Sequence, residues 1–160
     1  MEYVQERIAT LHDLTGRVPE VPVDRAAVVV PMIEREYASL PTEHTLSALE
    51  SVAPDRVVVA LRASPDRVGA FRRWLSGFDL QVDVLWCSGP RVGELLREHG
   101  LCGDAGKGRD LWLALGVAAD SDCEYVVAHD ADARSYSEAF VPRLLFPLDR
   151  GYAFSKGYYA

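Results

Sequence analysis

The sequence predicts an α/β domain built on a mainly parallel, doubly wound sheet flanked by helices. The run Ala26-Ala-Val-Val-Val30 is continuously apolar, which is typical of a strand buried on both faces in a parallel sheet. Strand and helix patterns then alternate along the chain, as expected for βαβ units. With 160 residues, 49% of them hydrophobic, the chain can bury one sizeable core.

The first 24 residues predict a helix and a connector. Val4, Ile8, Leu11 and Thr15 recur at helical spacing, so residues 2–15 are expected to form an amphipathic helix ended by Gly16. Such a helix serves packing or a contact between two copies in a homodimer. The proline-containing connector runs over 16–24, and 25–160 is expected to form the ligand-binding subdomain.

The remaining elements follow in a regular order. We expect Pro31 to close the first strand, after which a helix around 41–52 precedes a strand at 56–61. A helix around 65–76 then precedes a strand at 81–86. Helices around 91–99 and 109–119, the second with an apolar stripe through Leu111, Leu115 and Ala118, precede the strand 125–128.

Ligands of such sheets bind beyond the carboxyl ends of the strands, so the residues that follow strand ends should converge on one edge. These residues are Glu34, Arg62, Ser64, Asp130 and Asp132.

Composition restricts the partners and the compartment. A net charge of −7 and the absence of an Arg cluster interleaved with aromatics argue against nucleic acid. The acidic surplus with only two lysines fits either a halophile or a GC-rich genome. Cys87, Cys102 and Cys123 have no CxxC spacing and are expected to be free thiols in a reducing compartment. With no apolar window long enough for a membrane helix and no signal-peptide pattern, we expect a cytoplasmic protein.

Two carboxylates at the end of a buried strand are the strongest functional signal. Asp130 and Asp132 follow the apolar run 125–128 at spacing i and i+2, where both could hold Mg²⁺ or Mn²⁺. The alternative is a loop in which the aspartates cap a turn or the next helix. His129 points to the opposite face from Asp130, so we expect a packed histidine instead of a metal ligand.

A glycine-rich turn precedes the last predicted crossover helix. Gly106, Lys107 and Gly108 open that helix, and a glycine turn at a helix N-terminus presents N–H groups and a positive dipole end to phosphate. Lys107 adds a full charge. The segment matches neither a Walker A loop nor a GxGxxG fingerprint, and a flexible turn is the alternative.

Three weaker segments also follow strand ends or carry polar groups. The segment from Pro31 to Glu36 could receive a nucleoside, and Arg62 with Ser64 follows the second strand in the same way. Lys156 and Tyr158 could position a sugar or an anionic acceptor.

Four segments together resemble a known family. GKGRDLWLALG, VVAHDADARSYS, PRLLFPL and FSKGYYA, in this order, resemble the nucleotide-sugar-binding half of glucosyl-3-phosphoglycerate synthases and of the related mannosylglycerate-pathway synthases. These enzymes are GT-A-fold glycosyltransferases. The resemblance implies a metal-dependent retaining transferase that moves a hexose, glucose being favoured, from UDP- or GDP-hexose to 3-phosphoglycerate or glycerate in compatible-solute synthesis. Family members are longer, so the acceptor-binding part is expected to be absent and this piece alone to be inactive.

The resemblance also implies residue roles. It assigns Asp132 to the metal (Mg²⁺ or Mn²⁺), Asp130 to the ribose and sugar, Lys107 to the nucleotide and Ser64 to the base. The sequence Glu34-Arg35-Glu36 departs from the usual Asn-Glu-Glu of that turn, so which acid acts there stays open. The catalytic candidates are Asp130 and Lys107, and the candidates for an acceptor or sugar contact are Lys156 and Tyr158. The nucleotide-sugar-binding candidates are Pro31, Ile33, Glu34, Arg62, Ser64, Gly106, Lys107, Gly108, Asp130 and Ala131.

Two other functions compete with a transferase. A phosphatase of the haloacid-dehalogenase type also uses DxD after a buried strand, with the first Asp as nucleophile. Its motif normally continues to Thr or Val where this chain has Arg134, and it needs a downstream Lys and acids. The other alternative is a non-catalytic nucleotide-sugar-binding or assembly module.

Overall fold

The computed structural model describes residues 16–101 and 103–157. The helix predicted over 2–15, Cys102 and Tyr158 lie outside these ranges. Four parallel strands form one sheet in the order β3-β2-β1-β4, which confirms the predicted sheet. The strands are β1 (Ala26–Ile33), β2 (Arg56–Arg62), β3 (Val82–Trp86) and β4 (Tyr125–Ala128).

The helices follow the predicted alternation closely. Helix α1 (Leu40–Val52) connects β1 to β2, and α2 (Pro65–Leu75) connects β2 to β3. Helices α3 (Pro90–Glu98) and α4 (Lys107–Ala119) return the chain across the sheet to β4, and α5 (Phe140–Asp149) follows β4. Two short 3-10 turns, η2 (Val23–Arg25) and η3 (Glu34–Glu36), lie at the two ends of β1.

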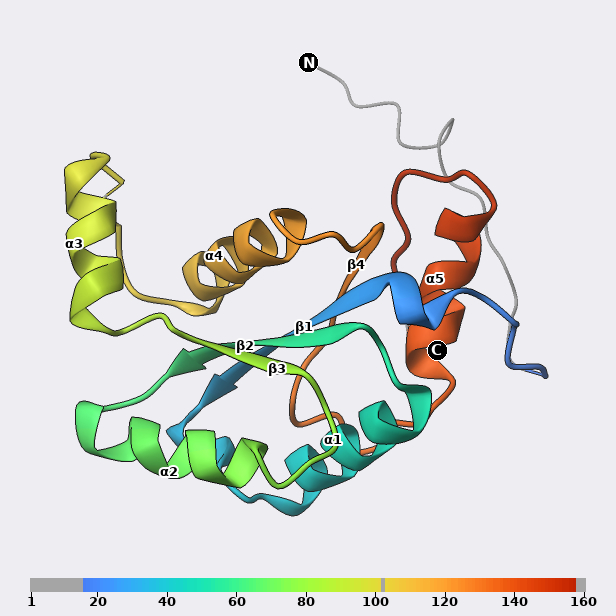
Figure 1. Cartoon of the computed structure of the whole chain (residues 1–160), viewed down its shortest axis with the longest axis horizontal. Helices are drawn as coiled ribbons and strands as arrows, with labels where there is room; N and C mark the ends of the chain where they lie inside the picture. The colour runs from blue at the N-terminus through green and yellow to red at the C-terminus, as the bar shows by residue number, and fades with distance from the viewer. Residues whose placement is uncertain (1–15, 102, 158–160) are drawn as a thin grey trace.

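Helices cover both faces of the sheet. Helices α1 and α2 lie on one face and α4 on the other, while α5 packs beside β4 (Figure 1). Alternate side chains of β1 therefore enter two cores: Val28 and Val30 pack with α1, α2 and α5, and Ala27 and Val29 pack with α4. Because both faces are covered, β1 reads as a continuous apolar run instead of an alternating one.

Pro31 lies inside β1, so the prediction that it closes the strand is wrong. The backbone of Val29 faces β4, since its carbonyl accepts the His129 N–H. By strand alternation Pro31 faces the same side, where β1 has no partner because its pairing with β4 stops at Val29 and Ala128. A residue without an N–H is tolerated there, while pairing with β2 continues to Ile33.

The stripe predicted on α4 is only partly correct. Ala118 is buried as expected, but the other fully covered residues are Ala114 and Asp110, and Leu115 is 37% exposed. Small alanines on the sheet-facing side let the helix lie close to β1 and β2, and large side chains are turned outward. No helix in the described ranges is long and apolar enough to cross a membrane.

Candidate active site

The sheet has its topological switch point between β1 and β4. The first two crossovers build the sheet outward from β1 to β3, and the return through α3 and α4 places β4 on the other side of β1. Ligands of open α/β sheets bind beyond the carboxyl ends of the strands at such a point. Turn η3 and the loop after β4, with Asp130 and Asp132, meet there.

Lys107 and Asp130 form an ion pair at this edge. Helix α4 begins at Lys107 with Gly106 as its N-cap, and no side chain caps its first N–H groups. The Lys107 ammonium contacts the Asp130 carboxylate, and both side chains are more than half exposed. A Cβ added at Gly106 or Gly108 would meet no atom within 4 Å, so the space above this turn is open. Open N–H groups, a dipole end and a lysine are what a phosphate needs.

Asp132 lies against the turn that follows β1. Its Oδ2 is 3.7 Å from Nη2 of Arg35, whose Nε is 3.7 Å from Oε1 of Glu36. Glu36 is buried and its Oε2 accepts the Ile33 N–H at 2.7 Å. Burial raises the pKa of Glu36 above its ordinary value, and the neighbouring Asp132 charge raises the pKa further. Two acids and one arginine thus meet across the switch point.

Glu34 joins the turn after β1 to the loop after β2. Its Oε1 accepts the Ser64 N–H at 2.5 Å, and this hydrogen bond lowers the pKa of Glu34. Ser64 precedes α2 but makes no side-chain hydrogen bond as its N-cap. The acid therefore fixes the spacing of two strand-end loops at this edge.

Arg62 contacts a buried carboxylate beneath the edge. Its Nε lies 3.1 Å from Oδ2 of Asp110, whose side chain is 3% exposed, and Arg109 donates to Oδ1 of the same group at 3.3 Å. Arg109 also donates to the Cys87 carbonyl at 3.2 Å. The triad ties the first turn of α4 to the ends of β2 and β3, so Arg62 serves here to position the lysine turn.

His129 is packed against Tyr136, in line with the expected packed histidine. Its Nε2 lies 2.8 Å from the hydroxyl of buried Tyr136, with the rings in contact. Burial lowers the pKa of His129 to about 4, so the imidazole is neutral at physiological pH.

The other candidates take varied positions. Ile33 has its N–H bonded to Glu36, and the Ala131 side chain is buried in the core on the α1 side. Lys156 is exposed in the segment after α5, with no ion pair or hydrogen bond in the described part of the chain.

Sequence reasoning missed three positions in this network. It did not foresee that Glu36 is buried, that Arg35 contacts Asp132, or that Asp110 is the buried member of α4. One available signal was the spacing of Asp110, Ala114 and Ala118, which places the acid on the alanine face of the helix.

The donor set at the edge suits a hard divalent cation. Asp130 and Asp132 offer carboxylate oxygens, which Mg²⁺ and Mn²⁺ prefer. No group of three or more His, Cys, Asp and Glu side chains within 16–101 and 103–157 is placed to hold a metal ion. A cation held by so few protein ligands completes its shell with water and phosphate oxygens, as Mg²⁺ commonly does beside nucleotides. The residues therefore fit a cation that binds together with a diphosphate.

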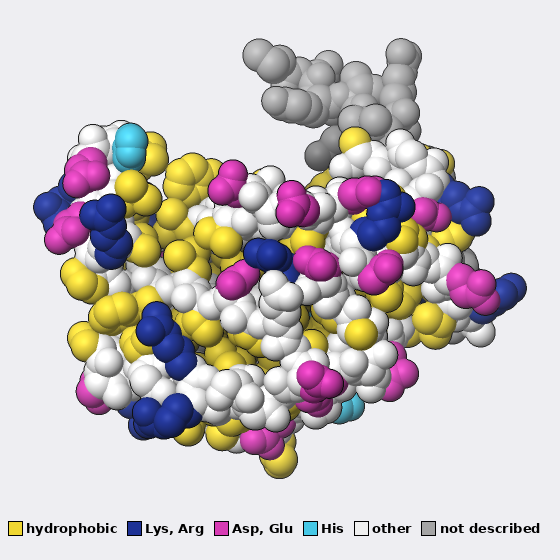
Figure 2. All heavy atoms as spheres, viewed as in Figure 1, with side chains coloured by type: hydrophobic (Ala, Val, Ile, Leu, Met, Phe, Trp, Pro, Cys, Tyr) yellow, Lys and Arg dark blue, Asp and Glu magenta, His cyan; other side chains and the backbone are white. Residues whose placement is uncertain are grey.

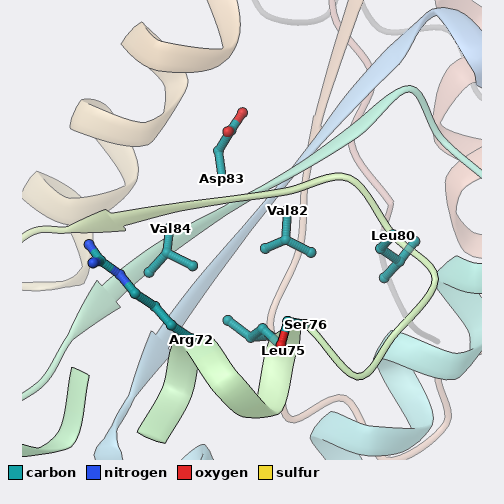
Figure 3. A pocket seen from close by; sticks show the side chains of 7 residues that line it. All are labelled: Arg72, Leu75, Ser76, Leu80, Val82, Asp83 and Val84. Carbon is teal, nitrogen blue, oxygen red and sulfur yellow. The ribbon is translucent and has the colours of Figure 1, made fainter. Parts of the chain in front are cut away.

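Two hollows lie away from these carboxylates. One lies between α2 and β3, where Val82 and Val84 point toward α2 and Asp83 points away (Figure 3). The other is apolar and lined by α4 residues, including Trp112 and Leu115. Hydrophobic side chains gather over this α3 and α4 surface (Figure 2).

Comparisons with known proteins identify relatives. No protein-family model matches the chain. The chain is similar to a glucosyl-3-phosphoglycerate synthase of Methanococcoides burtonii, with 31% identity over 179 aligned positions that cover 100% of the chain and 44% of that protein. A glucosyl-3-phosphoglycerate synthase of Persephonella marina is 35% identical over 114 positions, covering 66% of the chain and 28% of the relative. The chain thus spans less than half the length of the curated relatives it matches.

A solved structure supports the fold. The 4-diphosphocytidyl-2C-methyl-D-erythritolsynthase of Anaerococcus prevotii superimposes with a TM-score of 0.56 and 16% identity, covering 77% of this chain and 50% of that one. The likeness is one of α/β architecture, with a parallel sheet flanked by helices. The sequence matches, one of which covers the full chain, establish that the chain is homologous to the glucosyl-3-phosphoglycerate synthases.

Proposed function

We propose that this chain is the nucleotide-sugar-binding part of a metal-dependent, retaining hexosyltransferase. The donor is a UDP- or GDP-hexose, with glucose favoured, and the acceptor is 3-phosphoglycerate or glycerate. The reaction belongs to compatible-solute synthesis in the cytoplasm. One observation carries this proposal: in a homologue of glucosyl-3-phosphoglycerate synthases, Asp130, Asp132 and Lys107 meet at the switch point of the sheet.

The proposed chemistry follows from charge. Breaking the anomeric bond leaves a nucleoside diphosphate whose new negative charge must be stabilised. The Lys107 ammonium and the uncapped N–H groups of the first α4 turn would bind that diphosphate. Asp130 pairs with Lys107 in the ligand-free protein and would receive ribose or sugar hydroxyls. Asp132 would hold Mg²⁺ or Mn²⁺, which supplies positive charge to the phosphates when bound.

The remaining roles belong to the edges of the site. Glu34, Ile33 and Pro31 are proposed to line the nucleoside side, with Ser64 at the base. Lys156 and Tyr158 are proposed for the sugar or acceptor. Because the chain spans less than half of its curated relatives, binding is a sharper readout than turnover.

The test is a binding panel by calorimetry. UDP-glucose, GDP-glucose and GDP-mannose are titrated with Mg²⁺ or Mn²⁺ into the wild type, Asp132→Ala and Asp120→Ala. Asp120 is a matched control because it is exposed at the other end of α4. We expect one nucleotide class to bind only with metal, Asp132→Ala to lose most of that binding, and Asp120→Ala to keep it. Equal heats from the wild type and Asp132→Ala would remove the metal-site assignment.

Two further measurements separate the alternatives. Hydrolysis of p-nitrophenyl phosphate without nucleotide would favour the phosphatase. Heat protection by UDP or GDP without any need for Asp132 would favour a non-catalytic binding module, since any ligand that binds only the folded state raises its stability.

A further inference from the structure

Arg35 is a residue for which the transferase chemistry has assigned no role. It lies in η3 at the switch point, and its side chain is 73% exposed. Among the described residues its ion-pair partners are Glu36 and Asp132, both at 3.7 Å. At that distance and exposure the pairs are weakly held and open to exchange.

Arg35 and Lys107 contact the two aspartates from different elements. Lys107 comes from the start of α4 and pairs with Asp130, and Arg35 comes from the turn after β1 and pairs with Asp132. In the ligand-free protein, each exposed aspartate is therefore paired with its own basic side chain. The buried Glu36, fixed by the Ile33 N–H, lies on the other side of Arg35.

The charges at this edge nearly cancel because of Arg35. Asp130, Asp132 and Glu36 contribute three negative charges, and Arg35 and Lys107 contribute two positive charges, for a net charge of −1. Without Arg35 the same groups would carry −2 and attract a free divalent cation more strongly. With a cation bound, the wild-type edge would carry +1 and attract a diphosphate.

We propose that Arg35 is an anion-binding arm opposite Lys107. In the ligand-free protein it occupies Asp132 and disfavours binding of a free divalent cation. When the cation and a nucleoside diphosphate arrive together, the guanidinium leaves Asp132 for a phosphate oxygen. Arginine suits this exchange because it is always charged and its planar fork matches phosphate oxygens. This inference rests on the proposed function and names Arg35 as the residue that couples metal binding to nucleotide binding.

The test compares metal alone with metal plus nucleotide. Calorimetry is run with MnCl₂ alone, and then with UDP or GDP in the presence of MnCl₂. The variants are Arg35→Gln, Arg35→Lys and Arg17→Gln. Arg17 is a matched control because its side chain is 86% exposed and pairs with Glu20 in the connector before β1. Circular dichroism melts confirm that each variant is folded.

We expect Arg35→Gln to bind Mn²⁺ alone about threefold to tenfold more tightly, because the weak ion pair with Asp132 that competes with the metal is removed. The same variant should bind the nucleoside diphosphate with Mn²⁺ about tenfold more weakly, since a charge-assisted hydrogen bond is lost. Arg35→Lys should match the wild type for Mn²⁺ alone and fall between the two for the diphosphate. Arg17→Gln should match the wild type in both titrations.

Three outcomes would overturn the inference, and they differ in what else they affect. If the wild type binds metal and diphosphate together but Arg35→Gln does so equally well, Arg35 has no such role and the proposed function stands. If Arg35→Gln binds Mn²⁺ alone no more tightly than the wild type, competition for Asp132 is excluded. If the wild type binds neither UDP nor GDP with metal, the proposed function fails and this inference fails with it.

Discussion

The buried carboxylate of Asp110 and the exposed carboxylates of Asp130 and Asp132 differ in how their charge is balanced. The Asp110 side chain is 3% exposed and lies between Arg62 and Arg109, whereas those of Asp130 and Asp132 are 57% and 50% exposed, and each pairs with one cation. Breaking a buried ion pair leaves an uncompensated charge at high cost, while exposed pairs contribute little because water and salt replace the partner.

This difference separates positioning from binding. The inner triad of Asp110, Arg62 and Arg109 holds the first turn of α4 to the ends of β2 and β3, and so fixes the position of Lys107. The outer pairs can exchange their partners for a ligand at small cost. The ion pairs that fix the structure therefore lie beneath the site, and the ion pairs that a ligand can replace lie on its surface.

The largest expected effect comes from the inner triad. Asp110→Asn should lower the free energy of unfolding by about 3 kcal/mol, the low end for a broken buried pair because both arginines are partly exposed. Urea denaturation measures the change. Asp104→Asn, an exposed position in the preceding loop, should stay within about 0.5 kcal/mol of the wild type. A change of no more than about 0.5 kcal/mol in Asp110→Asn would show that the buried and the exposed acids do not differ in their contribution to stability.

A second effect is expected from His129, the half-buried neighbour of exposed Asp130. Its pKa is lowered to about 4 in the folded state against about 6.5 in the unfolded state, so the unfolded chain binds more protons between these values. Its contribution to stability is therefore present near pH 7 and is lost as pH falls toward 4. Lowering the pH from 7 to 5 should therefore reduce the free energy of unfolding by about 2 kcal/mol through this group.

The variant His129→Gln tests this pH dependence. Glutamine keeps a polar partner near Tyr136 but does not titrate. Urea midpoints at pH 7 and pH 5 should therefore fall less in the variant than in the wild type. An equal fall in both proteins would mean that His129 is not the group responsible.

The smallest effect on stability is expected at the outer pair. Lys107→Met should change the free energy of unfolding by no more than about 0.5 kcal/mol, because its pair with Asp130 is exposed. Binding of UDP or GDP with Mn²⁺ should weaken about tenfold if the lysine contacts phosphate. Arg17→Gln, at an exposed position in the connector before β1, is the control and should leave both quantities unchanged. A loss of stability in Lys107→Met comparable to that of Asp110→Asn would show that the lysine stabilises the fold in the same way as the inner triad.

The sheet could be predicted because its signals are local. Apolar runs mark β1 and β2, and the carboxylates at the end of β4 mark the edge where ligands bind. Pro31 and Leu115 were misplaced because a strand partner's length and the approach of α4 to the sheet depend on distant residues. The strand-end residues were expected to converge, and contacts such as Glu34 to Ser64 and Arg35 to Asp132 join them.

By itself, the sequence determined the fold class, the alternation of strands and helices that creates the edge, and the residue types placed there. Periodicity and strand-end position suffice for these, since they depend on neighbours along the chain. Only the tertiary structure decided the pairing of charges: Asp110 with two arginines inside, Arg35 with Asp132 outside, and Glu36 buried beside them. Which cation faces which carboxylate depends on how β1, β2 and α4 pack, because the energy of a charge is set by burial and distance in space.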